Sequence, residues 1–116
     1  MSDDRPPAAP SFVLDPLALV LEPEDPAASP RTSDHVLDAS ADGRLIRGIW
    51  ECEPGSVEDV EEDELFVVLS GRATVDLRSG ERLELRPGSV GVLRRGERTR
   101  WTVHETLRKA YQITLP

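Results

Sequence analysis

The chain has few residues of several chemically useful kinds. Its 116 residues include one cysteine, Cys52, one lysine, Lys109, and two histidines. A single cysteine can form neither an internal disulfide nor, by itself, a thiolate metal site. No apolar run is long enough to span a membrane, and the first residues lack the basic and apolar character of a secretion signal. We therefore expect a cytoplasmic protein that does not contact a membrane.

Basic residues are outnumbered by acidic ones, 14 to 22, and the formal net charge is −8. An acidic protein is repelled by phosphate backbones and by anionic membrane surfaces. Nucleic acid is therefore not expected as a partner. The length corresponds to a single domain with a small core, which would gain apolar burial from a second subunit. We expect a homodimer.

Proline is concentrated in the first third of the chain, and this divides the sequence into three parts. Residues 1–11 have too few apolar side chains to fold and are predicted to be a disordered tail. Residues 12–43 carry apolar clusters interrupted by prolines that would break a helix, so we expect an extended arm packed on the domain. Residues 44–116 are predicted to form that domain.

From residue 44 onward, short apolar or alternating segments are separated by turns that contain glycine. They predict seven strands, at residues 44–50, 65–70, 72–77, 82–86, 90–94, 98–104 and 108–115. Such spacing favours an all-β sandwich or barrel. Residues 65–69 are apolar at every position, which fits a strand covered on both faces, the outer one by the arm or by a second subunit.

Two spacings frame this region: six residues separate Glu64 from Gly71, and seven separate Gly88 from Gly96. The frame resembles the two motifs of the cupin superfamily. The segment 101–111, read as WTVHETLRKAY, is similar to the cupin family named after (S)-ureidoglycine aminohydrolase, many of whose small members have no known function. The resemblance covers roughly residues 45–115. It implies a single-domain, antiparallel jelly-roll barrel over residues 44–116, usually dimeric, with an internal pocket.

Metal-binding cupins carry a His-x-His pair three or four residues before the motif glutamate, which here is Glu64, and a further histidine three residues after the second glycine. The corresponding positions are Glu58 and Val60 or Val57 and Asp59, and then Thr99. None is a histidine, and carboxylates without imidazoles hold transition metals weakly. We therefore expect no cofactor, with Glu58 and Glu64 as weak candidate ligands for a divalent metal.

Strand alternation indicates which side chains share the interior. Lys109 is in phase with Tyr111, and Trp101 is in phase with Thr99. A lysine on an apolar face calls for an acid or an anionic ligand, so Lys109 either pairs with Glu64 or extends its ammonium to water. Trp101 is either a flat wall for a ligand or simply part of the core.

Three functions remain open. In the favoured one, a small polar or anionic molecule binds inside the barrel, in a pocket lined by Glu64, Thr99, Trp101, Lys109 and Tyr111. The second is an aminohydrolase-like enzyme acting on a C–N bond of a small nitrogenous compound, with Glu64 as acid or base while Lys109 and Tyr111 orient the substrate. The third is a structural or dimerisation domain whose barrel is filled by its own side chains. The rest of the acidic run 58–64 is expected to be a solvated loop.

Overall fold

The computed structural model of the chain describes residues 4, 7 and 9–116, so most of the predicted tail, residues 1–11, lies outside the described residues. The described part contains eight strands and no helix, which confirms the predicted all-β class. None of it is a helix long and apolar enough to cross a membrane. The strands are β1 (Glu22–Pro23), β2 (Thr32–Ala39), β3 (Leu45–Cys52), β4 (Gly55–Val60), β5 (Asp63–Leu77), β6 (Arg82–Leu85), β7 (Val90–Leu93) and β8 (Arg98–Thr114).

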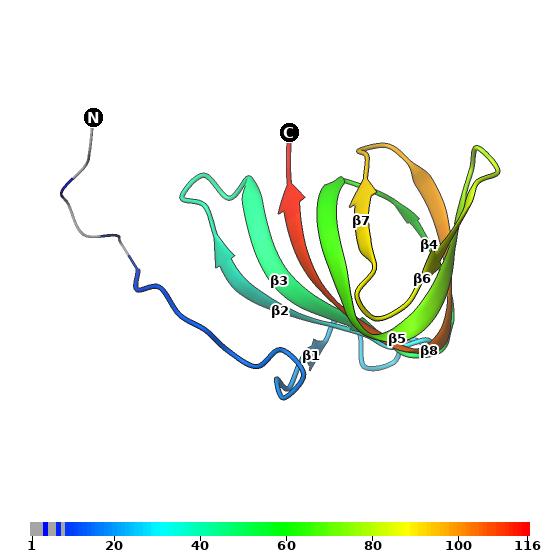
Figure 1. The fold of residues 1–116 in the computed structure, drawn as a ribbon, viewed down its shortest axis with the longest axis horizontal. Coiled ribbons are helices and arrows are strands. Elements are labelled where there is room, and N and C mark those ends of the chain that lie inside the picture. The colour runs from blue at the N-terminus through cyan, green and yellow to red at the C-terminus, as the bar shows by residue number, and fades with distance from the viewer. Residues whose placement is uncertain (1–3, 5–6, 8) are drawn as a thin grey trace.

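The two longest strands, β5 and β8, pair with each other and build the wall of a barrel (Figure 1). The first half of β5 pairs with β7, and the second half of β8 pairs with β3, which continues to β2 and β1. The second half of β5 pairs with β6, and the first half of β8 pairs with β4. All pairings are antiparallel, so the predicted jelly-roll barrel is confirmed.

Gly71 lies where β5 bends between these two halves of the barrel. The register between β5 and β8 shifts repeatedly over residues 68–73. Gly71 has a φ of 87°, a left-handed conformation that glycine adopts without strain. A side-chain carbon at this position would also collide with the backbone of Thr106 on β8. The glycine that ends the first predicted motif therefore serves the bend of the wall.

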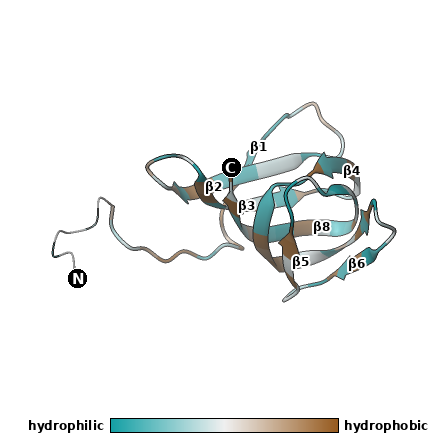
Figure 2. Cartoon of the chain, turned by 90° about the horizontal axis from the view of Figure 1, so that it is seen from above, coloured by the Kyte–Doolittle hydropathy of each residue, from teal (hydrophilic) through white to brown (hydrophobic). Residues whose placement is uncertain are grey.

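Buried and more exposed side chains alternate along much of β5 and β8. Figure 2 shows the apolar and polar stretches along the ribbon. Ten buried side chains form the core: Cys52, Phe66, Val68, Ala73, Val75, Leu85, Leu93, Trp101, Val103 and Leu107. Burial raises the pKa of the Cys52 thiol to about 11, which suits a small core side chain and not a nucleophile.

The segment predicted as an extended arm, residues 12–43, contains the first two strands. β1 pairs with β2, and β2 pairs with β3 along its length. Before β1, the chain is held by the guanidinium of Arg108, which donates hydrogen bonds to the carbonyl oxygens of Pro16 at 2.7 Å and Leu19 at 2.8 Å. The sheet therefore begins inside the predicted arm and not at residue 44.

The outer face of β5 carries exposed apolar side chains. Leu65 pairs with Val92 of β7, and Val67 pairs with Val90. Leu65, Val90 and Val92 are 50%, 69% and 54% exposed. Within the part of the chain that the structure describes, the arm does not cover this face, and its cover by a second subunit stays a prediction.

Candidate functional site

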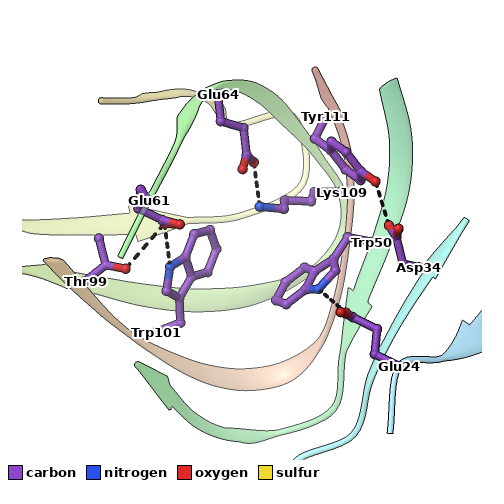
Figure 3. Close-up of polar contacts among 9 residues, drawn as sticks. All are labelled: Glu24, Asp34, Trp50, Glu61, Glu64, Thr99, Trp101, Lys109 and Tyr111. Carbon is purple, nitrogen blue, oxygen red and sulfur yellow. Dashed lines mark hydrogen bonds and ion pairs between the residues drawn. The ribbon is translucent and has the colours of Figure 1, made fainter. Parts of the chain in front are cut away.

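A cavity of about 210 Å³ remains inside the barrel, with wall residues from β2, β3, β4, β5 and β8. Most of the polar contacts in its wall are drawn in Figure 3. The side chains that line it are aromatic, acidic or apolar, with one lysine: Glu24, Asp34, Trp50, Val57, Asp59, Glu61, Glu64, Trp101, Lys109, Tyr111 and Ile113.

Lys109 and Glu64 form a buried ion pair in this wall. Lys109 Nζ donates a hydrogen bond of 2.6 Å to Glu64 Oε2, and the side chains of both residues are less than one-tenth exposed. The two residues come from β8 and β5, which are neighbouring strands. Removing either partner would leave the other as an uncompensated buried charge. Because Glu64 already neutralises the Lys109 ammonium, the ammonium is not available to pair with an anionic ligand.

Three aromatic rings surround the Lys109 ammonium. Its Nζ lies 4.7 Å from the ring centre of Trp101, 4.8 Å from Trp50 and 5.0 Å from Phe66. The faces of aromatic rings carry partial negative charge, so they attract the ammonium most strongly where water is excluded. One carboxylate and three aromatic rings therefore surround the Lys109 ammonium on an otherwise apolar strand face.

Glu61 is a second buried carboxylate of the cavity, only 6% exposed. It lies in the short connection between β4 and β5. Its Oε2 accepts hydrogen bonds of 3.3 Å from the Thr99 hydroxyl and from the Trp101 indole N–H. Burial, and then the negative charge of Asp59, raise the pKa of Glu61 to about 7. This group can therefore hold or release a proton near neutral pH.

Two further acceptors lie near the N-terminal strands. Glu24, which directly follows β1, accepts a hydrogen bond of 3.1 Å from the Trp50 indole N–H. Asp34 on β2 accepts one of 2.8 Å from the Tyr111 hydroxyl. Burial and the Asp34 contact raise the pKa of Tyr111, so its phenol stays protonated. A side-chain carbon at Gly48 would collide with that phenol, which explains glycine on β3 opposite Tyr111.

The structure brings four of the five expected ligand residues to the cavity wall: Glu64, Trp101, Lys109 and Tyr111. The fifth, Thr99, is buried but acts at the cavity only by holding Glu61. The weak metal candidate Glu58 lies outside the cavity, where it pairs with Arg100 at 3.2 Å.

The wall contains five polar or aromatic residues that sequence reasoning did not assign to a site: Glu24, Asp34, Trp50, Asp59 and Glu61. Glu61 was expected to be solvated. Of the two alignments considered for the missing His-x-His pair, the structure has Val57 and Asp59 on the cavity side of β4. If the sequence had indicated that β4 is a strand with Val57 facing inward, alternation would also have placed Asp59 on the inner face.

The donor atoms of the wall do not fit a transition metal. No group of three or more His, Cys, Asp or Glu side chains able to hold a metal ion occurs among the described residues. An ammonium, Lys109 Nζ, also stands beside the one motif glutamate that the chain retains. The wall therefore provides hydrogen-bond acceptors, the Glu61 carboxyl group that can hold or release a proton, and flat aromatic rings.

A larger depression of about 850 Å³ lies on the surface where β4, β5 and β8 meet. Its charged side chains are exposed, and two of them, Glu58 and Arg100, pair with each other. Hydrated, mutually screened charges contribute little to specific recognition. The internal cavity is therefore the candidate site.

Comparison with known proteins identifies the domain. The family model of the EutQ-like cupin domain matches residues 39–111. No curated protein sequence matches the chain. The structure resembles that of a protein described as ethanolamine utilization protein Q from Salmonella typhimurium LT2, with a TM-score of 0.74 and 20% identity over 88% of this chain and 84% of that one. At this identity the likeness speaks for the fold alone.

Two proteins of the DUF861 family are also similar. One, from Pseudomonas syringae pv. tomato DC3000, is 27% identical with a TM-score of 0.73, over 87% of this chain and 46% of that one. The other, from Thermotoga maritima, is 29% identical with a TM-score of 0.54, over 56% of this chain and 75% of that one. The chain spans less than half of the Pseudomonas protein.

Proposed function

This chain belongs to the EutQ-like cupin domain family, and we propose that it binds a small polar molecule inside its barrel without a transition metal. The observation that carries the proposal is the cavity of about 210 Å³, whose wall includes a buried ion pair, a buried carboxylate and two indoles. A barrel that served only as a scaffold would be expected to fill this space with apolar side chains, because buried polar groups are costly.

The size and polarity of the cavity limit the ligand. A volume of 210 Å³ corresponds to about seven water molecules at liquid density. An anionic ligand is disfavoured because Lys109, the one cationic side chain of the wall, is already neutralised by Glu64. The expected ligand is therefore small, polar, and neutral or cationic.

The two tryptophans of the chain make this proposal directly testable. Trp50 and Trp101 both line the cavity and both direct their indole N–H groups at carboxylates there. A ¹⁵N-labelled protein will therefore give two indole N–H signals, each a reporter of the site. A screen of small polar compounds should yield at least one that moves both signals.

A filling variant provides the control for such binding. Val57 lines the cavity, whereas Val60 on the same strand is 56% exposed. Val57→Phe should abolish binding, and Val60→Phe should leave it unchanged. If no compound of any charge binds and Val57→Phe only stabilises the fold, the barrel is a structural or dimerisation domain and the proposal is wrong. Elemental analysis that returned about one transition metal per chain would contradict the metal-free part.

A second candidate function is hydrolysis of a C–N bond, as the resemblance to the ureidoglycine aminohydrolase family suggests. The observation that favours it is Glu61, a cavity carboxylate whose pKa of about 7 suits a general acid or base. Ammonia release from ureidoglycine that Glu61→Gln abolished would support this activity. Binding without turnover would leave the chain a binding protein.

A further inference from the structure

The cavity carries more negative charge than its own residues neutralise. Five carboxyl side chains line it, from Glu24, Asp34, Asp59, Glu61 and Glu64, against one ammonium. The ammonium of Lys109 is taken up by Glu64 at 2.6 Å. The other four carboxyl groups line the cavity without a compensating cation from its wall; Glu61 is buried, Asp34 is half-buried, and Glu24 and Asp59 are exposed.

The arginines that the structure describes do not supply that cation. In the described residues, arginine ion pairs involve seven carboxylates, none of which lines the cavity: Asp38, Glu51, Glu53, Glu58, Glu62, Asp76 and Glu105. The described arginines thus form ion pairs with acids elsewhere and with none of the cavity acids, of which Glu64 alone has a cationic partner. Repulsion between Asp59 and the buried Glu61 disfavours their joint ionisation unless a bound cation or a proton relieves it.

Among the cavity acids without a cationic partner, Glu61 is the one that is buried. Its side chain is 6% exposed, and both hydrogen bonds that it accepts from described side chains reach Oε2. Asp59, another acid, also acts on the Glu61 carboxyl group. A buried carboxylate beside another carboxylate is an arrangement in which a donor-rich cation gains much.

We propose, on the basis of the proposed function above, that the ligand of this cavity is a small organic cation, a guanidinium, amidinium or primary ammonium compound, whose nitrogen donors bind Glu61 and Asp59. The indole of Trp101 forms the wall beside Glu61 and offers a flat apolar surface. Planar cations stack well on such rings. The ligand supplies the charge that the wall lacks.

An inorganic cation fits the same wall less well. The described acidic side chains do not converge in any group of three that could hold a metal ion. Divalent ions such as Ca²⁺ and Mg²⁺ require six or more oxygen ligands or a retained water shell, whereas aromatic walls supply none. An organic cation uses both the carboxylates and the indoles.

Three probes of nearly equal size separate charge from shape. Guanidinium, urea and acetate are planar and have four non-hydrogen atoms each, and they differ in charge. Each is titrated into ¹⁵N-labelled protein at constant ionic strength, and the indole N–H signals of Trp50 and Trp101 are followed. Guanidinium should move both signals with a dissociation constant of about 1 mM or tighter, within the limit for so small a ligand. Urea should bind at least about tenfold more weakly, and acetate should not bind.

Two glutamine variants locate the interaction. Glu61→Gln should weaken guanidinium binding at least about tenfold, because a neutral amide replaces the buried charge. Glu58→Gln changes a carboxylate of the same acidic run that lies outside the cavity, and it should leave binding unchanged. Equal affinity for urea and guanidinium, or equal loss in both variants, would overturn the inference. If neutral compounds from the wider screen bind while guanidinium does not, the inference fails and the proposed function stands. If nothing binds, both fail.

Discussion

Replacing Glu61 by glutamine removes one ionisable group from the cavity wall and keeps its size and its ability to accept hydrogen bonds. The wild-type carboxyl is buried beside Asp59, and its pKa is raised from 4.5 to about 7. The side chain is 6% exposed, so water screens its charge poorly. The variant should therefore change how the stability of the protein depends on pH.

The direction follows from proton binding. Between about pH 4.5 and pH 7 the folded state keeps a proton on Glu61 that the unfolded state has released. The free energy of unfolding therefore falls as the pH rises through this window. Below pH 4.5 Glu61 is protonated in both the folded and the unfolded state, so its burial does not lower stability. Above pH 7 it is ionised in both states, and the full cost of keeping this charge buried is subtracted from the free energy of unfolding. One pKa unit corresponds to about 1.4 kcal/mol, so the full cost is on the order of 3 kcal/mol.

Glu61→Gln should escape this cost. Near pH 4.5 the variant and the wild type should be similarly stable, and above pH 7 the variant should be more stable by on the order of 3 kcal/mol. For a domain of this size, that corresponds to a melting temperature higher by roughly 10 °C. Thermal and urea unfolding across this pH range measure the difference, and Glu58→Gln serves as the control at an exposed carboxylate.

The same group can be observed without unfolding the protein. Because the Trp101 indole N–H donates to Glu61, its NMR signal should titrate with a midpoint near pH 7 in the wild type and not in the variant. Parallel stability curves for the wild type and Glu61→Gln would refute the reasoning, as would a Trp101 signal that titrates near the pH of ordinary carboxylates.

Two further predictions concern the ion pair and the outer face. Lys109→Met should destabilise the fold by about 3–5 kcal/mol because it leaves the Glu64 charge buried and unpaired, and the double variant with Glu64→Leu should recover most of this loss in urea unfolding. If Lys109→Met and the double variant were equally stable, the Lys109–Glu64 pair would not be buried in solution. The apolar outer face of β5 predicts a dimer at micromolar concentration, which Leu65→Asp should convert to a monomer in light scattering, whereas Val36→Asp on β2 should not; a monomeric wild type would contradict this prediction.

Strand phase gave the part of the site that depends on local periodicity. Alternation along β5 and β8 places Glu64, Trp101, Lys109 and Tyr111 on the inner face without knowledge of the partner strands. The prediction of two short strands in place of each of these long ones was less successful. The bend at Gly71 was interpreted as a break, but pairing with β8 resumes beyond it.

The missed part of the site depends on contacts between distant segments. β4 carries two adjacent acids, a composition typical of a loop, and it becomes a strand because β8 supplies its hydrogen bonds from Arg98 to Val103. Glu24 and Asp34 reach the cavity only because the chain before residue 44 pairs with β3. Local propensity contains none of this information, so the acidic side of the cavity could not be predicted from the sequence.

In the proposed metal-free site, the fixed positive charge beside the motif glutamate is the Lys109 ammonium, and this limits which ligands the barrel can favour. A metal ion accepts lone pairs and exchanges ligands, so it attracts anions and polarises carbonyl groups. The Lys109 ammonium is covalently fixed and carries one charge, which is neutralised by Glu64. A ligand would therefore be recognised by the groups that surround the ion pair, which are hydrogen-bond acceptors and indoles. The proposed site favours hydrogen-bond donors over acceptors in its ligand, and Glu61 could take up or give a proton there.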